Sequence, residues 1–132
     1  MKASWRIRTL RGLAVVAFVF GLATIQAGWS VLFGEGAASA GRFVPFVVWF
    51  NFVAGFFYVA AAVGLWRQVP WGRGLALALA LASALIFAAF GIHVAMGGAY
   101  EMRTVAAMTL RTLFWAALAA LARPGKTPVE AA

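Results

Sequence analysis

The ionisable side chains that could do chemistry in this apolar chain gather between residues 91 and 115. His93 stands near the end of one long apolar run. Glu101 and Arg103 lie in the short break that follows, and Arg111 lies inside the next run. An imidazole, a carboxylate and two guanidinium groups can together hold an anion, balance its charge or move a proton. This segment is therefore the first candidate for a functional site.

The composition places these groups in a membrane protein. Of the 132 residues, 65% are hydrophobic and 11% are charged, and the mean hydropathy is +0.95. A soluble fold could not bury so much apolar surface, so the bilayer is the expected solvent. The net charge of +8 does not indicate nucleic-acid binding, because the basic residues stand at the ends of apolar runs and few polar residues remain for a phosphate-binding surface. The absence of cysteine excludes disulfides and thiolate metal sites.

Four apolar runs are long enough to cross a bilayer, whose hydrocarbon core needs about 20 helical residues. The predicted spans are about 12–33, 43–66, 74–96 and 103–122, and the tail 123–132 is expected to be disordered. A basic turn over 67–73 should separate the second span from the third, with Pro70 and Gly72 as helix breakers. The short connections predict one membrane domain over 1–132, an all-α, integral membrane four-helix antiparallel bundle.

The distribution of basic residues predicts the orientation of this bundle. On the side of the termini a four-pass chain would place Lys2, Arg6, Arg8, Arg11, Arg67, Arg73, Arg123 and Lys126. The loops on the other side would hold only Arg42 and Arg103. Cytoplasmic loops carry the excess of Lys and Arg, so both termini are expected in the cytoplasm, and a bacterial inner membrane is the expected location.

Two stripes of small residues at helical spacing predict places where helices approach closely. Glycine, alanine and threonine at such positions let two backbones come together in a membrane. The first stripe comprises Ala17, Gly21, Thr24 and Gly28, and the second comprises Gly74, Ala78 and Ala82.

With this topology, each helix offers one polar side chain to the outer half of the bilayer. At about 1.5 Å per residue, Asn51 and Arg111 lie about 12 Å below the outer ends of their helices. Gln26 lies about 10 Å deep and His93 about 6 Å deep by the same count. Polar side chains within a bilayer cost free energy unless they pair or meet water, so these four should face the bundle interior. We therefore predict a shared pocket that opens toward the outer face.

The predicted ligand-binding residues of this pocket are Gln26, Asn51, Tyr58, His93, Glu101, Arg103 and Arg111. Glu101 and Arg103 would form its rim, and Arg111 would hold a small anionic ligand or ion. Glu101 would neutralise Arg111 when the pocket is empty, with Glu35 as the other acidic candidate. The inward face of the last span is expected to carry Thr104, Met108, Arg111 and Trp115.

A structural explanation stands beside each of these roles. Arg111 and Glu101 could form an ion pair that pins the last helix to the preceding loop. Asn51 and Gln26 could form interhelical hydrogen bonds worth about 0.6 kcal/mol each. His93 could be a hydrogen-bonded histidine near the membrane surface rather than a ligand.

Three classes of function remain open at this point. The first is a protein that handles a small ligand or ion at the outer pocket. The second is an accessory or assembly subunit that acts through helix contacts, with a membrane partner subunit or as a homo-oligomer. The third is a redox protein with a metal or haem on His93, although one histidine forms neither a bis-histidine haem nor a zinc site, and no metal or cofactor is expected. An enzyme ranks last, because no nucleophile or cofactor motif is present.

Overall fold

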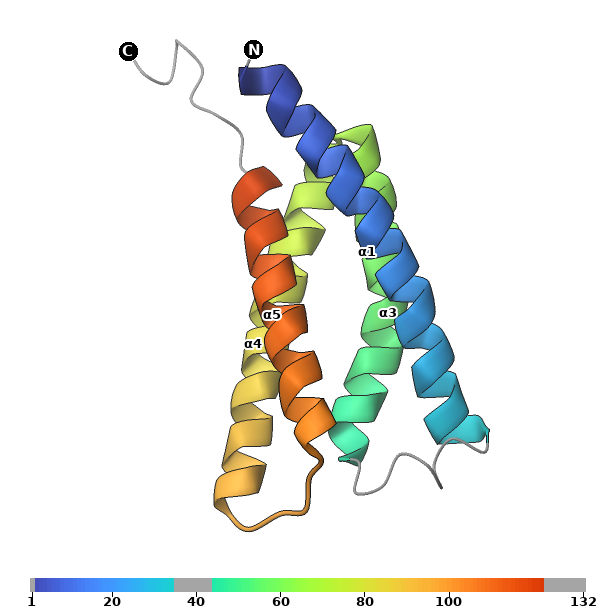
Figure 1. The fold of residues 1–132 in the computed structure, drawn as a ribbon, viewed down its shortest axis with the longest axis vertical. Coiled ribbons are helices and arrows are strands. Elements are labelled where there is room, and N and C mark those ends of the chain that lie inside the picture. The colour runs from blue at the N-terminus through green and yellow to red at the C-terminus, as the bar shows by residue number, and fades with distance from the viewer. Residues whose placement is uncertain (1, 35–43, 123–132) are drawn as a thin grey trace.

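The computed structural model describes residues 2–34 and 44–122. Four helices make up most of this part of the chain, and it contains no strand. They are α1 (Lys2–Phe33), α3 (Pro45–Arg67), α4 (Pro70–Ala95) and α5 (Met102–Ala122), shown in Figure 1. Each helix is long and apolar enough to cross a membrane. The predicted all-α four-helix membrane bundle is confirmed, whereas the expected disorder of 123–132 concerns residues outside this description.

Large apolar side chains cover the outside of all four helices. The exposed fractions reach 60% for Val19, 53% for Phe56, 72% for Leu85 and 64% for Leu113. Contiguous apolar surface of this extent is unfavourable in water but is the natural surface of a helix in hydrocarbon. The chain is therefore an integral membrane protein.

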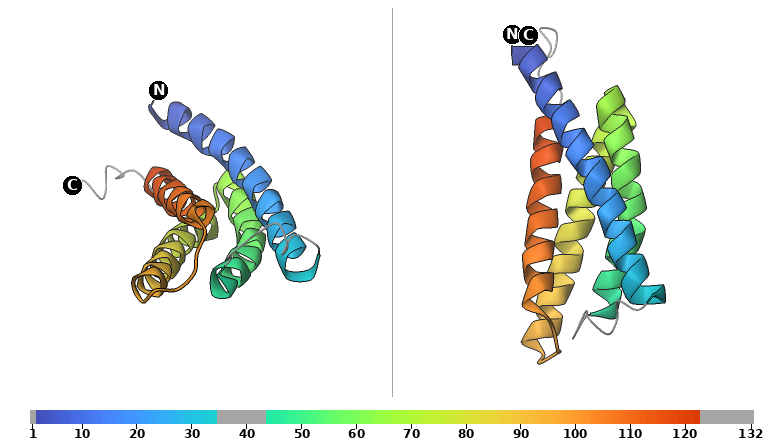
Figure 2. Two further views of the ribbon diagram at one scale, coloured as in Figure 1. Left: turned by 60° about the horizontal axis from the view of Figure 1, so that its bottom comes forward. Right: turned by 45° about the vertical axis from the view of Figure 1, so that its right-hand side comes forward.

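The helices alternate in direction and associate as two pairs. α1 packs along α3 and α4 packs along α5, while α3 and α4 join the pairs, as Figure 2 shows. α1 and α5 touch one another far less. We call the end where α1 begins and α5 ends the proximal end, and the opposite end the distal end (Figure 1). The seam between α1 and α5 is the loosely packed side of the bundle.

The turn between α3 and α4 is shorter than the predicted segment 67–73. Only Gln68 and Val69 separate the two helices, and Gln68 adopts the left-handed conformation with φ of 58°. Pro70 is the first residue of α4, a position where proline loses no helical hydrogen bond. The prediction that Gly72 breaks the helix is therefore wrong, and α4 begins four residues before the predicted span.

Gly72 instead forms the closest crossing of α3 and α4. A Cβ atom on Gly72 would lie 2.5 Å from the carbonyl carbon of Gly64, and a Cβ atom on Gly64 would lie 2.7 Å from the Cα of Gly72. Both glycines are buried. The two backbones thus meet directly, in the way that small residues permit in membranes.

The two predicted small-residue stripes have opposite outcomes. The first lies in the α1–α3 interface with all four members buried, and a Cβ on Gly21 would lie 3.0 Å from the Gly55 carbonyl oxygen. The second is wrong, because Gly74 and Ala78 are exposed on α4. α4 buries another face, which carries Gly72, Ala76, Leu79, Ala80, Ser83 and Phe90.

The core of the bundle forms around aromatic side chains from α3 and α5. Tyr58 and Trp115 are fully buried, with ring centroids 4.8 Å apart. Met108 is fully buried in a second cluster nearer the distal end. The predicted inward face of the last span is correct at Met108 and Trp115, and this rotation of α5 also directs Arg111 into the bundle.

Candidate functional site

A cavity of about 250 Å³ lies between α1, α3 and α5 at the distal end. We call it the distal cavity. Its polar lining consists of Asn51, Glu101, Arg103 and Thr104. Its apolar walls consist of Ala27, Val31, Val44, Val47, Val48 and Ala107. Three of the seven predicted binding residues, Asn51, Glu101 and Arg103, therefore share one space.

Helical spacing explains how these side chains reach the cavity. Val44, Val47 and Asn51 recur at intervals of three and four residues, so they lie on one side of the first turns of α3. Glu101 directly precedes α5, and its carbonyl oxygen accepts a hydrogen bond of 3.0 Å from the Thr104 N–H. A carboxylate at this position also meets the positive end of the α5 dipole, which favours it.

Arg111 contacts Thr24 deeper in the bundle, about one helical turn from the residues that line the distal cavity. Arg111 Nη1 donates a hydrogen bond of 3.0 Å to Thr24 Oγ1, which joins α5 to α1. The guanidinium carbon lies 5.0 Å from the ring centroid of Phe20, within the range of a cation–π contact. Arg111 stands one helical turn beyond Ala107, and Thr24 lies one turn from Ala27. Arg111 itself does not line the cavity, so its positive charge acts on the cavity from beneath rather than by direct contact.

The ion pair considered for Arg111 and Glu101 does not form. Ten residues along α5 separate the two, which corresponds to about 15 Å of helix and exceeds the joint reach of their side chains. Glu35, the other acidic candidate, lies outside the described residues. Within 2–34 and 44–122, the contacts of Arg111 are with a hydroxyl group and aromatic rings rather than with a carboxylate.

Several buried polar atoms of the described residues have no hydrogen-bond partner. The Tyr58 hydroxyl is close to Ser83, to the Trp115 indole N–H and to the charge of Arg111, yet it has no well-formed hydrogen bond to any of them. Among the described residues the buried atoms in this condition are Asn51 Oδ1, Tyr58 Oη, Ser83 Oγ, Arg111 Nε, Thr112 Oγ1 and Trp115 Nε1. Each such atom costs about 1–3 kcal/mol unless a guest molecule or water meets it. Asn51, which lines the distal cavity, carries one of these buried atoms.

His93 is separate from the distal cavity. Its Nε2 lies 2.9 Å from the carbonyl oxygen of Ala99, so the ring fastens the turn that follows α4. The ring also packs between Phe46 and Phe90, with centroid distances of 6.1 Å and 6.4 Å. A Cβ atom on Gly98 would overlap it. These contacts support the structural role for His93 rather than a place in the binding site.

We predict that His93→Ala loosens this turn without affecting the distal cavity. The variant loses the hydrogen bond to Ala99, so the amides of residues 97–101 should exchange with deuterium at least about fivefold faster, in line with a hydrogen bond worth about 1 kcal/mol. Hydrogen-exchange mass spectrometry of the purified protein measures this. If this variant also made position 51 less accessible to reagents from solution, His93 would have to be counted among the residues of the binding site.

Thr24, rather than the predicted Gln26, is the polar side chain of α1 that faces the interior of the bundle. Gln26 is exposed on α1, and it does not line the distal cavity although its neighbour Ala27 does. Thr24 is 3% exposed and holds Arg111. Sequence reasoning treated Thr24 only as a packing residue, although its place between Gly21 and Gly28 on the buried stripe was the signal that could have identified it.

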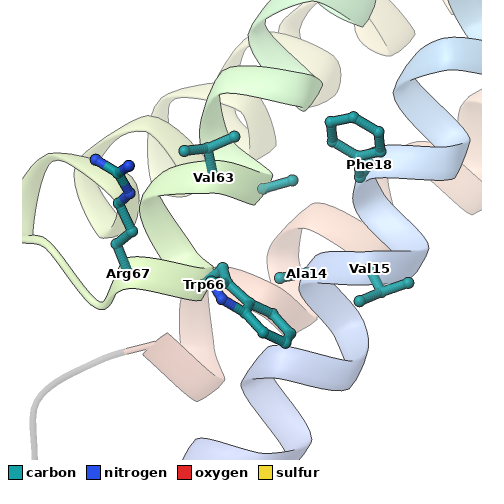
Figure 3. A pocket seen from close by; sticks show the side chains of 7 residues that line it. Ala14, Val15, Phe18, Val63, Trp66 and Arg67 are labelled. Atoms are coloured by element: carbon teal, nitrogen blue, oxygen red, sulfur yellow. The ribbon is translucent and has the colours of Figure 1, made fainter.

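Two other kinds of site, a metal site and a hollow between α1 and α3, offer fewer groups that could bind a ligand. No group of three potential metal ligands among histidine, cysteine and acidic residues occurs in the described part of the chain. A hollow of about 190 Å³ between α1 and α3 is lined by apolar side chains with Trp66 and Arg67, as Figure 3 shows. The Arg67 side chain extends away from α1 there, and the guanidinium of Arg11 lies 5.2 Å from the Trp66 ring. This hollow presents no convergent polar groups to a ligand.

Comparisons with protein-family models, with curated proteins and with solved structures find no match to this chain. The kind of ligand that the distal cavity can bind must therefore be inferred from the residues that line it. A guest would meet a carboxylate and a guanidinium from the start of α5, and an amide and valine side chains from α3, with the charge of Arg111 about one helical turn deeper. Such a lining suits a small molecule or ion that carries charge.

Proposed function

We propose that this protein binds a small anionic ligand or ion in the distal cavity, from the outer side of a bacterial inner membrane. One observation carries the proposal. Asn51 of α3 and the polar residues at the start of α5 line one cavity of about 250 Å³, about one helical turn from the membrane-embedded cation of Arg111. Polar and charged side chains are costly in a bilayer, and they concentrate where ligands and ions are handled.

The charge of this region supports an anionic guest. Arg103 and Arg111 contribute two positive charges, and Glu101 is the one carboxylate within 2–34 and 44–122. At about 7 Å and an effective dielectric constant of about 20, one unit charge attracts an anion by about 2 kcal/mol. Because Arg111 contacts no carboxylate there, an entering anion would gain this attraction.

The distribution of basic residues supports the outward direction of the cavity. Arg6, Arg8, Arg11, Arg67 and Arg73 belong to the proximal end. At the distal end the described residues include one basic residue, Arg103. The positive-inside rule then assigns the proximal end and both termini to the cytoplasm, and the distal cavity to the outer face.

Thiol labelling tests this proposal, because the natural chain contains no cysteine. We expect Asn51→Cys to react from the outer side of sealed vesicles with the anionic reagent sulfonatoethyl methanethiosulfonate. The cationic trimethylammonioethyl reagent should react more slowly. After normalisation to a free thiol in solution, the preference for the anion should be at least about fivefold, from the Coulomb attraction of the arginines.

Gln26→Cys provides the matched control for labelling. Gln26 lies at a similar depth but points out of the bundle, where lipid should exclude both charged reagents. Equal protection of the two cysteines, or a preference for the cationic reagent, would contradict an anion-binding cavity. Labelling of Asn51→Cys from the opposite side of the membrane would contradict the proposed orientation but not the proposed anion-binding cavity.

A further inference from the structure

A second cavity lies at the proximal end and is lined by arginines from two helices. Its volume is about 170 Å³, and we call it the proximal cavity. Its lining consists of Arg6, Ile7, Leu10, Leu65, Gln68, Val69, Arg73 and Ala122. No carboxylate belongs to this lining. Two guanidinium groups in a small recess at the membrane surface are suited to a phosphate group.

The two arginines are held differently, and both have donors left for a ligand. Arg6 Nε donates a hydrogen bond of 2.7 Å to the carbonyl oxygen of Leu121, near the end of α5. This bond anchors the guanidinium and leaves its terminal nitrogens without a protein acceptor in the described chain. Arg73 is half-buried and forms no hydrogen bond or ion pair with a described residue. The recess therefore offers a fixed and an unengaged guanidinium.

The surroundings favour a group with net negative charge. The one described carboxylate, Glu101, stands at the opposite end of the bundle. Val69, which precedes the first residue of α4, also lines the proximal cavity, so the positive end of the α4 dipole faces it. A zwitterionic headgroup would bring an ammonium group that finds no acidic partner here. An anionic headgroup carries no such penalty.

An apolar groove begins at the same arginine. It lies between α4 and α5 with a volume of about 700 Å³, and Arg73 lines it together with Pro70, Gly74, Leu77, Ala80, Leu81, Ala84, Thr112, Ala116, Ala119 and Ala120. From Pro70 to Ala84 the groove follows α4 for about 21 Å, which exceeds the roughly 15 Å depth of one hydrocarbon leaflet. Gly74 and the small alanine side chains of both helices leave this space open. Its length and apolar walls suit an acyl chain.

We propose that the proximal cavity and this groove together form a specific site for an anionic phospholipid. The phosphate group accepts hydrogen bonds from Arg6 and Arg73, and one acyl chain lies in the groove between α4 and α5. The combination of a cationic recess with a long apolar groove favours a lipid over a free phosphate ion. The site is independent of the distal cavity, because it lies at the other end of the bundle and shares no lining residue with it.

Native mass spectrometry of the full chain in mild detergent tests the headgroup preference. The protein is mixed with equal amounts of phosphatidylglycerol and phosphatidylcholine that carry identical acyl chains. We expect one retained phosphatidylglycerol per chain. Arg6→Gln and Arg73→Gln should each lower the preference for phosphatidylglycerol by about fivefold, because each removes a guanidinium that attracts the net charge of this lipid and repels the ammonium group of phosphatidylcholine at close range.

Arg8→Gln is the matched control. Arg8 lies on the same helix and at the same membrane surface as Arg6, but it is exposed and does not line the proximal cavity. This variant should change the preference less than about twofold, because the exposed charge of Arg8 does not contact the headgroup and is screened by solvent. An equal loss in all three variants would overturn the proposal, because it would indicate diffuse attraction to the basic surface. Displacement of the lipid by millimolar inorganic phosphate would overturn it in favour of an ion site.

A variant of the groove tests the position of the acyl chain without changing any charge. Ala116 is exposed in the groove, so Ala116→Leu should fill part of this space and leave the helix contacts unaltered. We expect this variant to retain at least about threefold less phosphatidylglycerol, through loss of apolar contact area. Unchanged retention would overturn the placement of the chain. This measurement also keeps the proposal testable if an arginine variant fails to fold.

Discussion

Arg111→Met is expected to leave the stability of the bundle within about 1 kcal/mol of the parent chain and to abolish the anion preference of the distal cavity. Arg111 at this depth costs about 2.5–3.5 kcal/mol on the insertion scale. Its hydrogen bond to Thr24 and its contact with Phe20 return a similar amount, about 1.5–3 and 0.5–2 kcal/mol. Methionine fills comparable space without charge. The stability should therefore change little while the electrostatic attraction disappears.

The Arg111→Met result separates the two explanations that the sequence left open. Had Arg111 formed a buried ion pair, its removal would strand a carboxylate and cost about 3–5 kcal/mol. Reversible unfolding in mixed detergent measures stability, and thiol labelling at Asn51→Cys measures the anion preference. Arg111→Lys should keep most of the preference, because it keeps the charge. A large loss of stability, or an unchanged labelling ratio, would remove Arg111 from the proposed binding role.

Gly72→Ala is expected to destabilise the bundle by about 1–3 kcal/mol, the usual range for overpacking. The added Cβ would lie 2.5 Å and 2.8 Å from the carbonyl carbon and oxygen of Gly64, and 2.8 Å from the backbone nitrogen of Leu65. Backbone atoms cannot rotate away, so α3 and α4 would have to separate. This cost outweighs the gain of about 1 kcal/mol from replacing glycine by alanine within a helix.

Gly74→Ala is the control for Gly72→Ala, since it makes the same chemical change two residues later on the same helix. A Cβ on Gly74 would meet nothing within 4 Å. The control should therefore be neutral or more stable by up to about 1 kcal/mol. Circular dichroism during unfolding in mixed detergent compares the two. Equal effects in both variants would show that the α3–α4 crossing tolerates a methyl group and is not tightly packed.

The sequence by itself determined the helices and the kind of solvent around them. Within a bilayer a backbone must satisfy its hydrogen bonds internally, so an apolar run of about 20 residues has to be helical. Short connections then require neighbouring helices to run in opposite directions. The inward position of Met108 and Trp115 also followed, because the same stripe carries Arg111, which avoids lipid. Of the residues predicted to share a pocket, Asn51, Glu101 and Arg103 line one cavity, whereas Gln26, His93 and Arg111 do not line it.

Only the tertiary structure decided how each helix is rotated. Lipid is as apolar as a leucine side chain, so burial in this bundle leaves little of the periodic pattern that marks the inner face of a soluble helix. Depth can be counted along a helix, but the direction of a side chain around its axis cannot. For this reason Gln26 points outward while Thr24 meets Arg111, and Gly74 is exposed while Gly72 packs. His93 likewise turns to the Ala99 carbonyl, a contact set by the fold of the turn after α4.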